Sequence, residues 1–142
     1  MIKAILKNDV AMLKDISRQL VEELKNMKVK EEIVFDVRLA FEEALRNAMI
    51  HGNRLDPGKK VKVEADMREQ YVVISIEDEG SGFDPDSLPD PTLERNLLRE
   101  GGRGVFLIKK LMDEVIYENN GKKVRMVKMF CDKNEGRRVL CR

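Results

Sequence analysis

Apolar residues recur at helical spacing through the first third of the chain. Residues 10–27 carry apolar side chains three or four positions apart, at 10, 13, 16, 20 and 24, with charged residues between them. This spacing predicts an amphipathic helix, and Asn8 or Asp9 can provide its N-cap. Residues 2–6 precede it and are typical of a short strand.

The stretch 30–53 has the strongest helical pattern of the chain. Its apolar face is formed by Ile33, Val37, Ala40, Ala44 and Ala48 and widened by Phe41, Leu45 and Met49. We therefore expect a helix that is buried along much of its length. Gly52 suits the left-handed position that ends many helices, and predicts the C-terminus there.

One narrow stripe of this helix is polar. It contains Asp36, Glu43, Asn47 and Arg54, and Glu43 and Asn47 are four positions apart, so their side chains share one face. Polar groups on so apolar a helix are costly unless they are paired. The stripe is either a solvated surface strip or part of a site.

Period-two patterns follow this helix. A turn at 55–58 leads into two strands, 61–67 and 71–80, and residues 68–70 between them predict a hairpin. The segment 83–100 is rich in proline and aspartate, without periodicity. A loop this long within a compact domain is usually functional or mobile.

A second apolar helix is predicted over 105–115, opened by the glycines at 101–104. Two strands, 115–119 and 124–130, follow, and Asn119-Asn120-Gly121 predicts a tight turn between them. We expect one α/β domain over 1–142, with a core from about 5 to 131 and a polar tail at 132–142. Four methionines are expected in the core: Met49, Met112, Met126 and Met129.

Composition excludes several classes of protein. Lys and Arg number 27 against 26 Asp and Glu, so the basic character of a nucleic-acid-binding protein is absent. No apolar run is long enough to span a membrane. A single His and two Cys make a structural zinc site improbable by residue count, and we expect reduced thiols and a cytoplasmic location.

Two glycine-containing motifs are candidates for binding an anion or nucleotide. The first is Asp78-x-Gly80-x-Gly82, at the end of a strand, and the second is Gly101-Gly102-x-Gly104, before a helix. Glycines there let backbone N–H groups approach a phosphate, and a helix N-terminus favours negative charge. The spacing fits neither a P-loop nor a Rossmann fingerprint. Each motif alone also fits an ordinary turn.

Taken together, Glu43-x-x-x-Asn47-Ala-x-x-His51-Gly52, Asp78-x-Gly80-x-Gly82 and Gly101-Gly102-x-Gly104 are more specific. In order and separation they resemble the ATP-binding superfamily of gyrase, the heat-shock chaperone, histidine kinases and mismatch-repair ATPases (the GHKL, or Bergerat-fold, ATPases). The chain is most similar to the anti-sigma factor serine kinases within it. The resemblance covers residues from about 5 to 131.

The resemblance implies a two-layer α/β sandwich, with a mixed, largely antiparallel sheet and helices on one face. It implies that Asp78 binds adenine, that Gly80 and Gly82 leave room for the base, and that Asn47 binds Mg²⁺. Gly102 and Gly104 would shape a lid around the phosphates of ATP, and Glu43 would act as general base. One Asn is chemically sufficient for Mg²⁺, which keeps several waters.

The chain departs from the family pattern at two places. Lys122 and Lys123 follow Gly121 where relatives often have Thr, and Glu100 stands where close relatives can carry Arg. Arg99 or Arg103 is then the candidate cation for the γ-phosphate. His51 is either a capping residue or a phosphate contact.

Three functions fit the resemblance. The first is a partner-switching serine kinase that binds a sigma factor or similar client and phosphorylates a small antagonist protein, with a homodimer as one possible state. The second is a switch that holds ATP without transferring phosphate, and the third is a detached histidine-kinase-type ATPase domain. Glu43 favours the kinase over the switch, since holding a nucleotide needs no base.

Overall fold

The computed structural model of the chain describes residues 1–81 and 100–131. The irregular segment predicted over 83–100 lies outside these residues except for its last position, and so does the tail at 132–142. Within the described residues the elements follow in this order: β1 (Ile2–Lys7), α1 (Val10–Asn26), α2 (Glu31–Arg46), the π-helix η1 (Asn47–Gly52), β2 (Lys60–Met67), β3 (Tyr71–Glu77), α3 (Glu100–Leu111), β4 (Glu114–Glu118) and β5 (Lys123–Met129).

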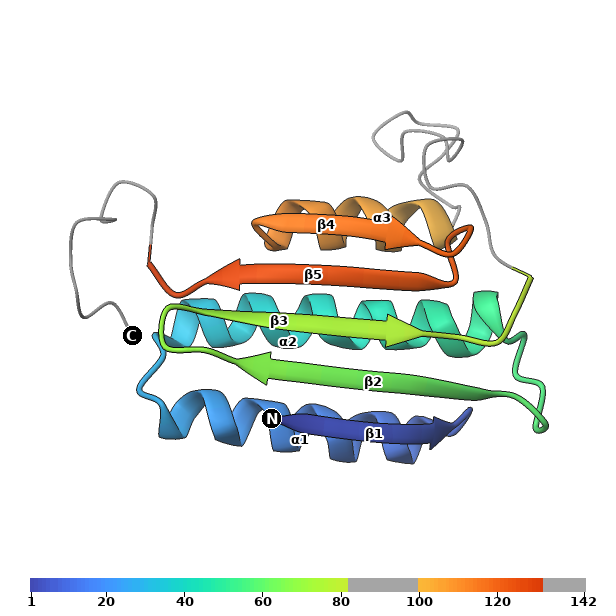
Figure 1. The fold of residues 1–142 in the computed structure, drawn as a ribbon, viewed down its shortest axis with the longest axis horizontal. Coiled ribbons are helices and arrows are strands. Elements are labelled where there is room, and N and C mark those ends of the chain that lie inside the picture. Colours follow the sequence, from blue (N-terminus) through green and yellow to red (C-terminus); the bar gives the residue numbers. More distant parts are fainter. Residues whose placement is uncertain (82–99, 132–142) are drawn as a thin grey trace.

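The five strands form one sheet in the order β1-β2-β3-β5-β4, and each of the four pairings is antiparallel. The three α-helices lie behind one face of this sheet, with α2 between α1 and α3 (Figure 1). The predicted two-layer α/β fold is therefore confirmed. The hairpin between β2 and β3 is confirmed too, closed by a hydrogen bond from the Arg68 N–H to the Tyr71 carbonyl.

The core fills the space between helices and sheet. The inward side chains of the strands alternate with outward polar ones, as in Val61, Val63 and Ala65 of β2 and Val72, Ile74 and Ile76 of β3. The helices contribute Leu20, Leu24, Val37, Phe41 and Leu45, among others. Burying each large aliphatic or aromatic side chain contributes about 1.5–3 kcal/mol.

The N-terminus of α1 has the predicted cap. Asp9 is extended, and its carboxylate accepts a hydrogen bond from the Ala11 N–H at 2.9 Å. Such a cap contributes about 1 kcal/mol to the stability of a helix.

The end of the central helix differs from the prediction. The α-helix stops at Arg46 and widens into η1, in which the Asn53 N–H bonds to the Ala48 carbonyl, five residues back. Gly52 has no positive φ, whereas Arg54 and Leu55, at φ 52° and 57°, are left-handed. The expected left-handed Gly52 is therefore wrong, because the wide turn carries the helix past it.

The last helix also differs from the prediction at both ends. It begins at Glu100, so the run of glycines lies inside its first turns, and it ends at Leu111. The Asp113 N–H bonds to the Val127 carbonyl of β5, so the chain has already joined the sheet at a position where the helix was expected to continue. The tight turn at Asn119-Asn120-Gly121 is confirmed, and all three residues are left-handed.

Two smaller expectations are wrong. Met129 is 37% exposed on the open face of the sheet, whereas Met49, Met112 and Met126 are buried. Cys131 is disulfide-bonded rather than reduced, and the only other cysteine of the chain, Cys141, lies outside the described residues.

Candidate active site at one end of the sandwich

Four elements meet at one end of the molecule. η1 follows α2 there, β3 ends, α3 begins, and the β4–β5 turn closes, all at the right of Figure 1. A cavity of about 250 Å³ lies among them. It is lined by Ala44, Asn47, Ala48, His51, Gly52, Ile76, Asp78, Val105, Ile108, Tyr117, Gly121, Lys122 and Val124. The cavity is thus largely apolar, with a few polar groups, as is typical of ligand sites.

The polar stripe of α2 meets the start of α3 beside this cavity. A Cβ added to Gly104 would lie 2.8 Å from Asn47 Nδ2, 3.0 Å from Asn47 Oδ1 and 3.1 Å from Glu43 Oε2. Glycine at this position therefore lets the first turns of α3 approach both side chains. The two residues predicted to carry the chemistry are adjacent in space as well as in helical spacing.

Glu43 is held on its other side by Arg46. Arg46 Nη1 donates to Glu43 Oε1 at 3.0 Å, while Oε2 faces Gly104. The Glu43 side chain is 26% exposed and that of Arg46 46%. The ion pair is too exposed to matter much for stability, but it orients the carboxylate.

Asp78 stands just after the end of β3 and is buried, with 8% of its surface exposed. Its backbone N–H bonds to the Lys122 carbonyl at 2.9 Å, and its Oδ1 accepts the Gly80 N–H at 2.8 Å. Burial raises the pKa of Asp78 above its usual value, against the opposing effect of the Gly80 hydrogen bond and of Lys122 and Lys59. A buried carboxylate in an apolar cavity is a strong acceptor for a donor on a ligand.

Gly52 and Gly80 allow two backbone segments to touch behind this carboxylate. A Cβ on Gly52 would overlap the Asp78 carboxylate, and a Cβ on Gly80 would overlap the Gly52 carbonyl. Both glycines are therefore needed for close approach rather than for a left-handed conformation. The sequence interpretation singled out Gly52 as a left-handed residue, whereas glycine is needed there because the Asp78 carboxylate comes so close.

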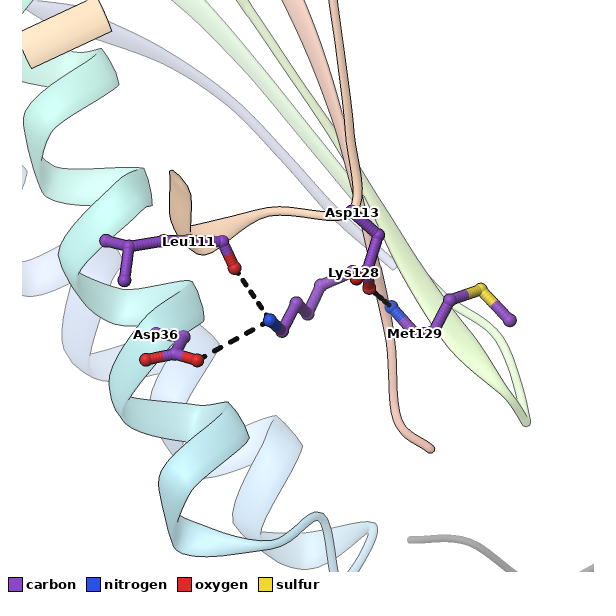
Figure 2. A network of polar contacts seen from close by, with 5 residues as sticks. All are labelled: Asp36, Leu111, Asp113, Lys128 and Met129. Atoms are coloured by element: carbon purple, nitrogen blue, oxygen red, sulfur yellow. Dashed lines mark hydrogen bonds and ion pairs between the residues drawn. The ribbon is translucent and has the colours of Figure 1, made fainter. Parts of the chain in front are cut away.

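The far end of α3 is anchored by the network in Figure 2. Lys128 Nζ bonds to the Leu111 carbonyl at 2.6 Å and pairs with Asp36 at 3.5 Å, while the Met129 N–H donates to Asp113 at 2.6 Å. The Lys128 side chain is only 14% exposed. Its ammonium group bonds to the last carbonyl of α3 and to a carboxylate of α2, so Lys128 connects the C-terminal end of α3 to α2 and to its own strand, β5.

Comparison with known protein families identifies the family of the chain. The histidine kinase-like ATPase domain matches residues 6–128. The chain belongs to this family.

Individual members of the family give a finer comparison. The serine-protein kinase RsbW of Staphylococcus aureus is 32% identical over 115 residues, covering 73% of this chain and 72% of that protein. The anti-sigma F factor of Geobacillus stearothermophilus is 32% identical over 108 residues, covering 69% and 70%. The RsbW of Oceanobacillus iheyensis is 32% identical over 96 residues, and the chain spans 60% of its length. The resemblance to the anti-sigma factor serine kinases is confirmed.

A solved structure shows the same fold. The structure of the RsbU and RsbW domains of Rv1364c from Mycobacterium tuberculosis superposes with a TM-score of 0.58 at 16% identity, over 91% of this chain and 32% of that one. An ATPase domain fold implies an ATP-binding site, and the cavity between η1, β3 and α3 is the candidate for it.

Not every predicted site residue falls in the described part of this ATPase domain. Gly82 and Arg99 lie outside it, and Gly102 and Arg103 lie in the first turn of α3 without described side chains. His51 and Lys122 do line the cavity. Lys122 replaces the Thr common in relatives, so this departure falls within the site itself.

Two contributors were missed by the sequence interpretation. Arg46 orients Glu43, and it could have been found from its i, i+3 spacing, which allows an ion pair on a helix. Tyr117 lines the cavity from β4, and burial raises its pKa well above the usual value. Only the alternating pattern of its strand could have indicated that it faces inward.

Residues 1–81 and 100–131 include no group of three or more His, Cys, Asp or Glu side chains that could hold a metal. In the same part of the chain, none of the helices is both long enough and apolar enough to cross a bilayer.

Proposed function

We propose that this ATPase domain is a protein-serine kinase of the partner-switching type, which transfers the γ-phosphate of ATP to a serine of a small antagonist protein. The observation that carries the proposal is the meeting of Glu43, Asn47 and the start of α3 beside the cavity that Asp78 lines. A carboxylate, a carboxamide oxygen and the first turns of a helix lie close together there, which supports a site for phosphoryl transfer.

Asp78 is the proposed adenine contact. Its buried carboxylate lines an otherwise largely apolar cavity, so it can accept a hydrogen bond from the exocyclic amino group of adenine. Guanine presents a carbonyl oxygen at the same position and would face this acceptor unfavourably. The apolar lining, including Ile76, Ile108 and Val124, suits the faces of the base.

The start of α3 is the proposed phosphate site. The first turns of a helix leave N–H groups unpaired, and their dipoles favour negative charge. Gly104 keeps side-chain atoms away from this end, and Gly102 lies in the same turn. Arg99 and Arg103 are the proposed cations for the γ-phosphate.

Asn47 is the proposed Mg²⁺ ligand. Its carboxamide oxygen is a hard donor of the kind magnesium prefers, and Asn47 lines the cavity next to the start of α3. The ion would share its remaining coordination with phosphate oxygens and water. Bound Mg²⁺ would supply charge neutralisation for the phosphates.

Glu43 is the proposed general base. Arg46 holds Oε1, which leaves Oε2 facing the space next to Asn47. In the transfer, the serine hydroxyl oxygen bonds to the γ-phosphorus, its proton passes to Oε2, and ADP leaves with the electron pair of the broken bond.

The proposed partners follow from the names of the relatives. A chain similar to a serine-protein kinase and to an anti-sigma F factor would bind a sigma factor or similar client and act on a small antagonist. We place this activity in the cytoplasm, where a sigma factor acts, without direct contacts to nucleic acid or membrane and with a homodimer as one possible state.

The magnesium role is tested by Asn47→Ala, with Asn26→Ala as the matched control. Asn26 ends α1 and is exposed at the opposite end of the molecule. Titration with ATP, with and without Mg²⁺, should show metal-dependent binding by the native protein and by Asn26→Ala, and its loss in Asn47→Ala. Metal-dependent binding of native strength by Asn47→Ala would contradict the assignment.

A further inference from the structure

Asn53 is a buried polar residue next to the turn that carries Asp78, the proposed adenine contact. It follows η1, and only 1% of its surface is exposed. Burying a carboxamide is costly unless its donors and acceptor are all satisfied. Its bonding partners therefore indicate what it holds in place.

The Asn53 side chain joins three separate segments of the chain. Nδ2 donates to Asn8 Oδ1 at 3.1 Å and to the Lys60 carbonyl at 3.0 Å, and Oδ1 accepts the Glu79 N–H at 2.8 Å. Glu79 is the middle residue of the Asp78-Glu79-Gly80 turn. The side chain that follows Gly52 thus binds the same turn that Gly52 contacts through its backbone.

Only a carboxamide fits these partners. Two oxygen acceptors face Nδ2, and one N–H donor faces Oδ1, so a carboxylate would bring oxygen against oxygen twice. An alanine would leave both the Lys60 carbonyl and the Glu79 N–H without their partner. The turn would then keep its Gly80-to-Asp78 hydrogen bond, the bond from the Lys60 N–H to the Glu79 carboxylate and its backbone contact with Gly52, but it would lose its hydrogen bond to the Asn53 side chain.

We infer that Asn53 is a positioning residue for base recognition: it fixes the Asp78–Gly80 turn so that the Asp78 carboxylate faces the cavity in one orientation. This inference rests on the proposed role of Asp78 in binding adenine. The preference for ATP then depends on two residues: Asp78 contacts adenine, and Asn53 holds Asp78 in the orientation that this contact needs.

Asn8 provides the matched control. It accepts from Asn53, and its own Nδ2 bonds to the Asp56 and Lys59 carbonyls at 2.6 and 3.1 Å. Asn8→Ala removes hydrogen bonds from the same network but leaves the Asn53-to-Glu79 bond intact. A purely structural role for the network predicts similar effects of both substitutions.

The experiment compares native protein, Asn53→Ala and Asn8→Ala by calorimetric titration with ATP and with GTP, alongside urea denaturation. We expect Asn53→Ala to lower the ratio of ATP to GTP affinity about tenfold, the scale of one lost buried hydrogen bond. The same ratio for Asn8→Ala should stay within about twofold of native even though its stability also falls. At saturating ATP, the phosphotransfer rate of Asn53→Ala should stay near the native rate.

Native-like discrimination by a folded Asn53→Ala, or an equal loss in Asn8→Ala, overturns the inference alone. Native protein that binds ATP and GTP equally, or binds neither, overturns the proposed function and the inference with it. If Asn53→Ala does not fold, amide exchange of the native protein decides. Slow exchange of the Glu79 N–H supports the bond to Asn53, and exchange at the rate of an unstructured peptide refutes it.

Discussion

Asp78 combines two demands that conflict at the scale of a single residue. In its proposed role the carboxylate must be buried to recognise adenine selectively, and burial disfavours its charged form. Because burial raises the pKa of Asp78 above its ordinary value of 3.8, the folded protein binds a proton there more readily than the unfolded chain. This contribution to stability is complete below pH 3.8 and is lost as the pH rises through the raised folded-state pKa.

Asp78→Asn should therefore separate function from stability. We expect it to lose most of its ATP affinity, on the order of 1–3 kcal/mol. The asparagine side chain has one neutral acceptor oxygen in place of two charged ones, and its NH₂ group cannot accept a hydrogen bond from adenine. At neutral pH it should also melt at a higher temperature than native protein, since no buried charge remains. Lowering the pH toward 3.8 should shrink that difference.

Calorimetry with ATP and thermal denaturation at several pH values check both parts of this prediction. Undiminished ATP affinity would refute the adenine contact. A lower melting temperature than native at neutral pH would show that the ionised carboxylate is stabilised by its surroundings.

Individual site residues were predictable to the extent that their signal is local. Glu43 and Asn47 stand out as polar residues on an apolar helix, and Asp78 ends an apolar strand. Asn53 has no such signal, since its partners Asn8, Lys60 and Glu79 come from three separate segments of the chain. The reason for glycine at position 52 likewise depends on the approach of Asp78, which only the tertiary structure reveals.

At the scale of elements, α3 links the site to the rest of the fold. Gly104 in its first turns lies against Glu43 and Asn47, and the carbonyl of its last residue, Leu111, accepts a hydrogen bond from Lys128 (Figure 2). The boundaries of this helix were predicted poorly, because glycines are usually helix breakers and the apolar pattern continues into β4. Tertiary contacts decide both ends.

Lys128→Met should destabilise the protein by about 1–3 kcal/mol, because it leaves the Leu111 carbonyl and the half-buried Asp36 without their cation. Lys62→Met is the matched control, since Lys62 pairs with Glu64 at 3.6 Å but its side chain is 60% exposed. An exposed pair contributes under about 1 kcal/mol.

Urea denaturation of both variants measures the difference, and amide exchange localises it. Faster exchange should concentrate at the end of α3 in Lys128→Met. Equal losses of stability in the two variants would contradict the anchoring role of Lys128.

The whole molecule shows which parts of a fold follow from patterns of sequence. The existence and type of each α-helix and strand in the described residues were predictable, because their apolar residues recur at a regular period, whereas the π-helix η1 was not predicted. The strand order β1-β2-β3-β5-β4 was not, because β1 reaches β2 across two helices and β4 lies outside β5. The disulfide bond of Cys131 was not predicted, because the sequence around a cysteine does not show whether its thiol is oxidised.

The meeting of α2 and α3 at one end of the sheet is the whole-molecule feature on which the account depends. In the proposed function Glu43 acts in the transfer step rather than in nucleotide binding. Glu43→Ala should therefore bind ATP about as well as native protein and lose serine phosphorylation. Glu42→Ala is the matched control, because Glu42 is the preceding residue of the same helix but bonds to Ser17 of α1 at 2.9 Å.

The decisive measurement is the single-turnover rate of phosphate transfer from labelled ATP to a serine of the antagonist protein, sought among candidates encoded beside this chain. At saturating ATP we expect a rate about 10²–10⁴ times slower for Glu43→Ala than for native protein. Glu42→Ala should transfer at nearly the native rate. Transfer at the native rate by Glu43→Ala would contradict the account, and a native protein that binds ATP but transfers to no candidate would make it a switch.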